Sequence, residues 1–221
     1  MPAEQSQKHD SLSLPLAPAA AMYELVRRRV KYIIACDADS DPAYEFGDLS
    51  NAIEKCRVDF GVQIEMGEYM KIAPDEKTRL SATHFAVGMI RYLPQSAAEE
   101  AYGTEPGVLV YIKRSITSDE PAQVLGQRSA GSSFPHDETL NQFFNETLFE
   151  AYRALGEHMG AILERAYTTF RATGSMVMPA PRDMAPEQRA DYVRVFFDCL
   201  LTKAWKDITL LIPDKPTLPQ G

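Results

Sequence analysis

The sequence is poor in cysteine and glycine, has no basic excess and has no long apolar run, and each shortage excludes a class of protein. Three cysteines among 221 residues do not make a disulfide framework and suit a reducing compartment. The 31 acidic side chains outnumber the 23 basic ones, so the chain has no overall field that attracts nucleic acid. No segment reaches the ~18 consecutive apolar residues that a membrane-spanning helix needs.

The start of the chain, MPAEQSQKHDSLSLPLAPAAAM, has no basic leader ahead of an apolar run, so we expect no signal peptide. Hydrophobic residues make up 45% and charged residues 24%, the proportions of an ordinary soluble protein. A chain of this length can bury a core without disulfides or metals. We therefore expect a cytoplasmic protein with no transmembrane segment, no nucleic-acid partner and no cofactor.

Residue periodicity predicts an α/β fold in which a mixed sheet is followed by a helical region. The unbroken apolar run Tyr32–Cys36 is typical of a strand buried on both faces. Helices are expected from Ala19, over Asp48–Asp59 and over 119–127, and further strands over Val62–Met66, His84–Tyr92 and Val108–Ile116. The last two strands should be antiparallel neighbours joined by a polar connection.

The second half of the chain is expected to be helical. A helix is predicted over Glu138–Thr173, with a break near Gly156, and another from Pro186 to Trp205 after a linker at 174–184. The predicted organisation is a flexible arm (1–18), a partial α/β region (19–137), a helical region (138–206) and a Pro-rich tail (207–221).

The strand Tyr32–Cys36 runs into an acidic turn with the pattern Asp37-x-Asp39-x-Asp41. An Asp-x-Asp after a strand is typical of haloacid-dehalogenase phosphatases, where the first Asp attacks phosphorus and Mg²⁺ assists. No later acidic pair completes that site. An EF-hand loop is disfavoured because Pro42 stands where the sharp turn needs Gly. The favoured interpretation is an acidic turn that caps the helix beginning near Asp48 and holds no specific divalent ion. The Asp48 side chain can accept a hydrogen bond near the start of that helix.

Nucleophile and metal motifs are also missing. There is no Gly-x-Ser-x-Gly, and Ser132-Ser133 lacks the closing glycine and a preceding strand. Cys36, Cys56 and Cys199 are expected to be small core residues, and no Cys-x-x-Cys or His-x-x-x-His spacing indicates zinc.

The four histidines have different settings. His84 starts a strand, His158 lies on a polar helix face and His9 lies in the arm. Only His136, in the loop Phe134–Asp137, has the setting of a site residue, and its role stays open. No catalytic, cofactor-binding or metal-ligating residue is assigned from these patterns.

Several stretches resemble, in order, the C-terminal part of the catalytic domain of large bacterial patatin-like phospholipases. They are MYELVRRRVKYIIACDADSDPAYEFGDLSNAIEKCRVDFGVQIEM, HFAVGMIRY, GVLVYIKRSITSDEPAQVL and FPHDETLNQFFNETLFEAYRALG. Together they span about residues 22–156. The resemblance implies a Ser–Asp acyl hydrolase of lipid metabolism, in which a Ser in a Gly-x-Ser-x-Gly turn attacks an ester and an Asp of an Asp-Gly-Gly motif is the base.

The chain departs from that family at the dyad. The Asp-Gly-Gly motif should fall about ten residues before Tyr23, where the sequence reads Ser11–Leu16 without an Asp or paired glycines. We therefore expect a truncated or divergent segment without its own dyad, which meets a lipid or acyl-ester substrate only together with the missing half. An unpaired strand edge would then favour self-association. The alternatives are a non-catalytic interaction module using 138–205 and, more remotely, a Mg²⁺-dependent phosphatase.

Overall fold

The computed structural model describes residues 18–67, 69–129, 133–138, 145–173, 185, 193–197 and 200. The predicted linker, the Pro-rich tail and all of the predicted arm except its last residue lie outside these ranges, as does Cys199. Within the described ranges, no helix is both long enough and apolar enough to cross a membrane.

The predicted α/β class is confirmed by a four-stranded mixed sheet in the order β1-β4-β3-β2. β1 runs parallel to β4, whereas β3 is antiparallel to both β4 and β2, as expected for the two longer strands. The elements are α1 (Pro18–Arg27), β1 (Tyr32–Asp37), α2 (Gly47–Phe60), β2 (Gln63–Met66), the 3₁₀ turn η1 (Tyr69–Ile72), β3 (Phe85–Arg91), α3 (Ala97–Tyr102), β4 (Gly107–Lys113), α4 (Ala122–Ser129) and α5 (Glu146–Thr173).

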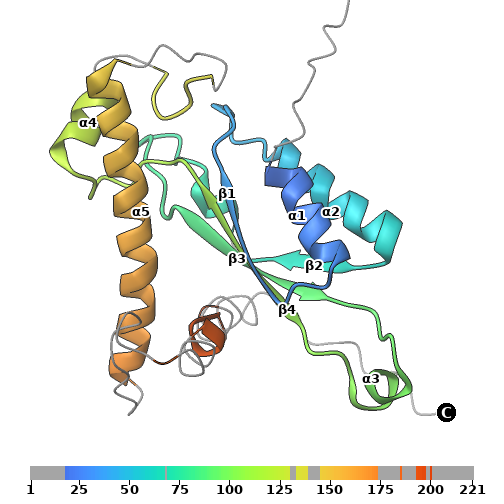
Figure 1. Cartoon of the computed structure of the whole chain (residues 1–221). Coiled ribbons are helices and arrows are strands. Elements are labelled where there is room, and N and C mark those ends of the chain that lie inside the picture. The colour runs from blue at the N-terminus through green and yellow to red at the C-terminus, as the bar shows by residue number, and fades with distance from the viewer. Residues whose placement is uncertain are drawn as a thin grey trace, which may run out of the picture.

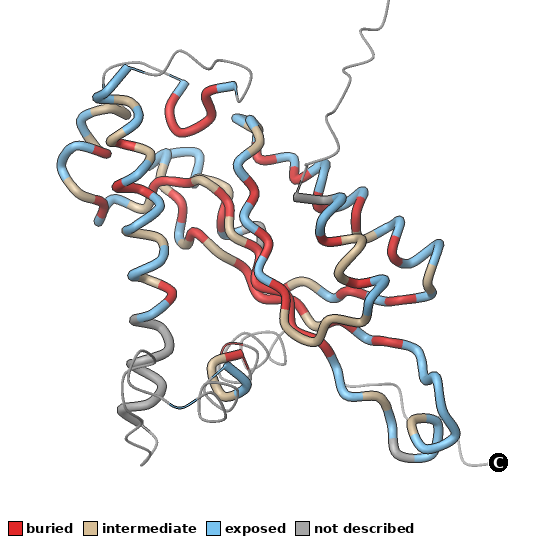
Figure 2. The backbone as a smooth tube through the Cα atoms, viewed as in Figure 1, coloured by how far each residue is buried: buried red, intermediate tan, exposed pale blue. Residues whose placement is uncertain are grey.

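Helices α1 and α2 lie side by side on one face of the sheet (Figure 1). Apolar residues of both helices, such as Val26 and Cys56, pack with Ile33, Leu109 and Tyr111 of the strands in one buried cluster. In Figure 2 the middle of the sheet is accordingly mostly buried. This burial supplies most of the driving force for folding on this side.

The other face of the sheet carries a second, smaller cluster. Val108 and Val110 of β4 pack there with Leu163 of α5 and with Phe197 and Leu200 near the C-terminal end of the described chain. A third cluster joins α4, α5 and the loop 133–138 beyond the end of β4.

Burial on both faces of Tyr32–Cys36 is not found in this structure. The burial of β1 alternates along the strand, and Ile34 is 48% exposed. Cys36 is also exposed, so its prediction as a core residue is wrong, whereas Cys56 is fully buried as expected. The reason is that, among the described strands, β1 lies at the end of the sheet, and its outward face meets the small second cluster.

Two helices differ from the prediction. The polar connection before β4 contains α3, whose first turn is capped because Ser96 Oγ accepts from Glu99 N–H at 3.1 Å. The predicted break at Gly156 is wrong, because α5 is continuous through that residue. Its buried face, which includes Ala151 and Leu155, outweighs the low helix propensity of one exposed glycine.

Candidate functional site at the carboxyl ends of β1 and β4

The last residues of the two parallel strands form a buried polar group next to a surface pocket. The β1–β4 register pairs Asp37 with Lys113 and Ala35 with Tyr111. Ligands of α/β sheets commonly bind at the carboxyl ends of parallel strands, so this position is the natural candidate site. Asp37 is 5% exposed and Lys113 1% exposed.

Three donors bond the Asp37 carboxylate, two at Oδ2 and one at Oδ1. Lys113 Nζ lies 2.8 Å from Asp37 Oδ2, and the Tyr111 hydroxyl donates a short hydrogen bond to the same oxygen. Asp39 N–H donates to Asp37 Oδ1 at 2.9 Å. These bonds hold the carboxylate in place beside the Lys113 ammonium.

Asp41 prepares the start of α2 and also faces Lys113. Its two carboxylate oxygens accept from the backbone N–H groups of Glu45 and Phe46, at 2.9 and 3.1 Å. Its Oδ2 lies 3.4 Å from Lys113 Nζ. The prediction that Asp48 provides the capping bond is not confirmed, because the N-cap position is Phe46 in a left-handed conformation without a side-chain cap.

Burial, neighbouring charges and hydrogen bonds shift the pKa values of the side chains around the buried Lys113 ammonium. Although burial raises the pKa of Asp41, the bonds from Glu45, Phe46 and Lys113 hold it below its usual value overall. Burial and the neighbouring charges of Asp37 and Asp48 instead raise the pKa of Asp39. Burial and the bond to Asp37 raise the pKa of Tyr111. The Lys113 ammonium therefore stands where a metal ion would neutralise these carboxylates.

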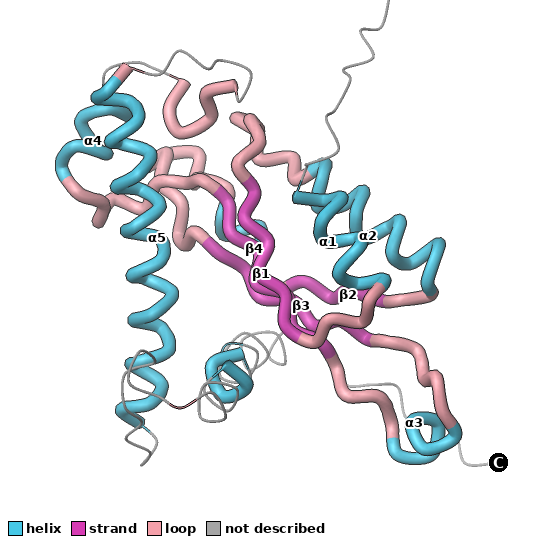
Figure 3. The backbone as a smooth tube through the Cα atoms, in the orientation of Figure 1, coloured by secondary structure: helices cyan, strands magenta, loops and turns pink. Residues whose placement is uncertain are grey.

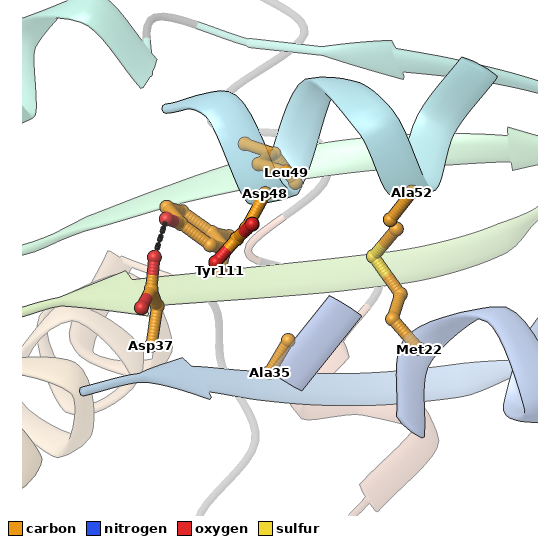
Figure 4. A pocket seen from close by; sticks show the side chains of 7 residues that line it. All are labelled: Met22, Ala35, Asp37, Asp48, Leu49, Ala52 and Tyr111. Carbon is orange, nitrogen blue, oxygen red and sulfur yellow. Dashed lines mark hydrogen bonds between the residues drawn. The ribbon is translucent and has the colours of Figure 1, made fainter. Parts of the chain in front are cut away.

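Two hollows adjoin this group. A small cavity beneath it, lined by Met22, Ala35, Leu49 and Ala52 as well as the polar residues, holds about 10 Å³, which is room for about one water molecule (Figure 4). A larger surface pocket of about 170 Å³ is lined by Ser40, Phe46, Gly47, Lys113 and the acids Asp37, Asp39, Asp41, Glu45 and Asp48. The only hydroxyl among these lining residues is that of Ser40, which donates to the carbonyl oxygen of His136 at 2.6 Å.

The Ser40 bond brings the loop 133–138 beside the end of β1 (Figure 3), so His136 and the acidic turn are neighbours. His136 is 7% exposed, its ring meets the Tyr44 ring edge-on with centroids 4.8 Å apart, and neither ring nitrogen has a hydrogen-bond partner among the described residues. Burial, together with the nearby charges of Arg114 and Lys113, lowers the pKa of His136 to about 4. The ring is therefore neutral at pH 7 and does not point into the surface pocket as a charged group.

Ser133 and Asp137 of the same loop form a hydroxyl–carboxylate pair, the residue types of the expected family dyad. Ser133 Oγ donates a short hydrogen bond to Asp137 Oδ1, and the Tyr152 hydroxyl donates to Asp137 Oδ2 at 2.7 Å. The pair is four residues apart in one loop, and the described elements before and after that loop are the helices α4 and α5. The arrangement anchors the loop to α5 and lacks the backbone setting of a nucleophile elbow.

The structure also gathers two histidines that the sequence patterns leave separate. His84, just before β3, and His158, on α5, have ring centroids 5.7 Å apart, with Asp119 and Glu120 beside them. Sequence reasoning missed this group because its members lie on three distant segments. The one available signal was the adjacent pair of acids Asp119-Glu120. This pair follows β4, and β4 pairs with β3, the strand directly after His84.

Comparisons with known proteins give no match: no family model, no curated protein and no solved structure corresponds to this chain.

Proposed function

We propose that this chain is a patatin-related α/β module without ester hydrolase activity of its own, which acts by pairing with another protein segment along β1. The observation that carries the proposal is the state of β1. Its residues Tyr32–Cys36 are all apolar, yet Ile34 is 48% exposed and Cys36 is exposed. In the described part of the chain, the hydrogen-bonded neighbour of β1 is β4 alone.

A parallel pair at the rim of a sheet is unusual, because parallel strands normally lie inside sheets with both faces covered. The free edge of β1 offers a row of backbone N–H and C=O groups to another strand. The exposed side chains of Ile34 and Cys36 would be covered by the same partner. A parallel or antiparallel strand added there extends the sheet of this module.

The contacts at the carboxyl ends of β1 and β4 support the non-catalytic half of the proposal. Asp37 accepts hydrogen bonds from Lys113, Tyr111 and the Asp39 N–H, which also disfavours a phosphatase nucleophile at this position. The Ser40 hydroxyl in the pocket donates its proton to the carbonyl oxygen of His136, and no hydrogen bond joins it to a carboxylate among the described residues.

We expect no hydrolysis of p-nitrophenyl butyrate by the purified chain and no Mg²⁺-dependent hydrolysis of p-nitrophenyl phosphate. Loss of a nucleophile removes most of the rate, about 10⁶-fold in one serine protease. The control is Ser133→Ala, because Ser133 is the serine whose hydroxyl bonds the Asp137 carboxylate. Ester hydrolysis that survives purification, is blocked by a fluorophosphonate and is lost in Ser133→Ala would contradict the proposal.

The pairing half predicts a species larger than the 24.7 kDa monomer in size-exclusion chromatography with light scattering. A monodisperse monomer with one sharp thermal transition would instead favour a self-standing module.

A further inference from the structure

We propose that His84, Asp119, Glu120 and His158 bind one divalent transition-metal ion, for which Zn²⁺ is the best fit. Each residue offers one ligand atom, and the four atoms lie within 4.8 Å of one another. Among the described residues this is the one group of at least three histidine, cysteine or acidic side chains that converges in this way. The inference is independent of the proposed function.

The spacing of the ligand atoms matches a four-coordinate ion. Two ligands bound to tetrahedral zinc at ~2.0–2.1 Å lie about 3.3 Å apart. The Nε2 atom of His158 lies 3.2 Å from Asp119 Oδ1, and the Nε2 atom of His84 lies 3.6 Å from Glu120 Oε1. The two imidazole rings are nearly perpendicular, at 88°, so both can present a nitrogen to a common point. Small side-chain rotations bring the four atoms to bonding distance.

The surrounding residues are placed as the second layer of a metal site requires. His84 Nδ1 lies 2.9 Å from Ser115 Oγ, which in turn reaches the carbonyl oxygens of Thr83 and Lys113 at 3.3 and 3.4 Å. With its proton on Nδ1, His84 donates to Ser115 and turns the lone pair of Nε2 toward the carboxylates. Such a bond to the second ring nitrogen orients most metal-binding histidines.

The carboxylates are held in the same manner. Ser118 N–H donates to Glu120 Oε2 at 2.8 Å, and Thr117 Oγ1 donates to Asp119 Oδ1 at 2.6 Å. These bonds fix each carboxylate and leave lone pairs facing the histidines. The Thr117 hydroxyl also lies 3.1 Å from His84 Nε2 and 3.0 Å from Glu120 Oε1. Glu120 Oε1 also accepts a short hydrogen bond from the Thr117 N–H, and the one hydroxyl proton of Thr117, donated to Asp119, cannot also satisfy His84 Nε2.

The two carboxylates of the group also favour a bound cation. The Glu120 side chain is 0% exposed and that of His84 1% exposed. Within the described ranges, the ion-pair partners of Asp119 and Glu120 are His158 and His84, with no lysine or arginine. The other contacts of the buried Glu120 carboxylate are the backbone N–H groups of Thr117 and Ser118 and the Thr117 hydroxyl, which carry no full positive charge. A divalent ion between the two carboxylates would supply that charge.

Two imidazole nitrogens and two carboxylate oxygens favour zinc over the alkaline-earth ions, since calcium and magnesium prefer all-oxygen ligands. The Asp119 side chain is 59% exposed and gives the ion an entry path. His84 directly precedes β3, Asp119 and Glu120 lie in the segment before α4, and His158 lies on α5. A bound ion would therefore fasten α5 to the sheet. Its role is therefore structural.

The test is isothermal titration of the whole, metal-free protein with Zn²⁺, alongside the visible absorption of the Co²⁺ form. We expect one equivalent to bind with a micromolar or lower Kd, a raised melting temperature, and cobalt bands typical of a four-coordinate ion. His158→Gln and Asp119→Asn should each weaken zinc binding at least tenfold. Glu157→Gln, an exposed acid beside His158 on α5, should not.

Circular dichroism melts establish that each variant is folded. If His158→Gln does not fold, Asp119→Asn decides the question, because its side chain is exposed and carries little packing. The absence of saturable binding to the wild-type chain would overturn the proposal. Binding of unchanged affinity in the folded variants, which would place the ion elsewhere, would also overturn it.

Discussion

At the scale of single residues, the chain has two groups of carboxylates with different kinds of charged partner. Lys113 serves as a built-in counter-ion for Asp37 and Asp41 at the carboxyl end of β4. Among the described residues, the ion-pair partners of the carboxylates Asp119 and Glu120, by contrast, are histidines. The spacing of Asp37, Asp39 and Asp41 could be read from the sequence, but their neutralisation by Lys113 could not, because it depends on the register of β1 against β4.

His136 should make the stability of the protein depend on pH. Its pKa is lowered from 6.5 to about 4 by burial and by Arg114 and Lys113, against the opposing pull of Asp41 and Asp37. Between these values the unfolded chain binds a proton that the folded chain does not. The stabilisation is therefore fully present above about pH 6.5 and falls as the pH drops toward 4, by up to about 3 kcal/mol.

The variant His136→Phe keeps a ring against Tyr44 and cannot be protonated. Urea unfolding at pH 8 and pH 5 should show the wild-type losing about 2 kcal/mol more than the variant on acidification. The value at pH 8 serves as the control, since there the two proteins differ by packing alone. Equal losses in both proteins would show that His136 is not responsible.

At the scale of secondary-structure elements, the sequence predicted the α1, β1, α2, β2, β3 and β4 segments within a few residues, because each has a clear apolar period. It missed α3, whose residues are polar, although the pattern Ser96-x-x-Glu99 is a capping signal. It also predicted a break at Gly156 that the packing of α5 overrides. Local patterns predict elements well when burial shapes them, and poorly when a cap or a tertiary contact decides.

The turn before α2 gives a test at this scale. Asp41→Ala removes the acceptor for the N–H groups of Glu45 and Phe46 and a partner of Lys113, so we expect a loss of about 1–2 kcal/mol in the free energy of unfolding. Asp39→Ala, two residues away, removes a carboxylate whose charge is disfavoured by burial, Asp37 and Asp48, so no loss is expected. Urea titrations of both variants at pH 7 provide the comparison. A loss in Asp39→Ala as large as in Asp41→Ala would show that the turn is not organised by Asp41.

At the scale of the whole molecule, the two faces of the sheet are unequally covered. The face under α1 and α2 holds the largest buried cluster, whereas the opposite face has a smaller one and leaves Ile34 at 48% exposure. The sequence predicted that β1 belongs inside a sheet and that one of its edges would be unpaired in this chain. The described strands show such an unpaired edge, because β1 stands at the end of the strand order. The position of the His84 and His158 group was beyond sequence reasoning, because only the packing of α5 beside the sheet creates it.

The exposure of Ile34 on the less covered face of the sheet allows a test of association along β1. Ile34→Lys puts a charge on the exposed side of the edge strand, a change that natural edge strands use against pairing. Light scattering after size-exclusion chromatography should show the wild-type chain self-associated and Ile34→Lys shifted toward the 24.7 kDa monomer. Val58→Lys is the matched control, because Val58 is a 66% exposed apolar residue on α2, away from β1, and its replacement should leave association unchanged. If Val58→Lys dissociates the protein as well as Ile34→Lys does, association is general hydrophobic contact and the pairing role of β1 fails.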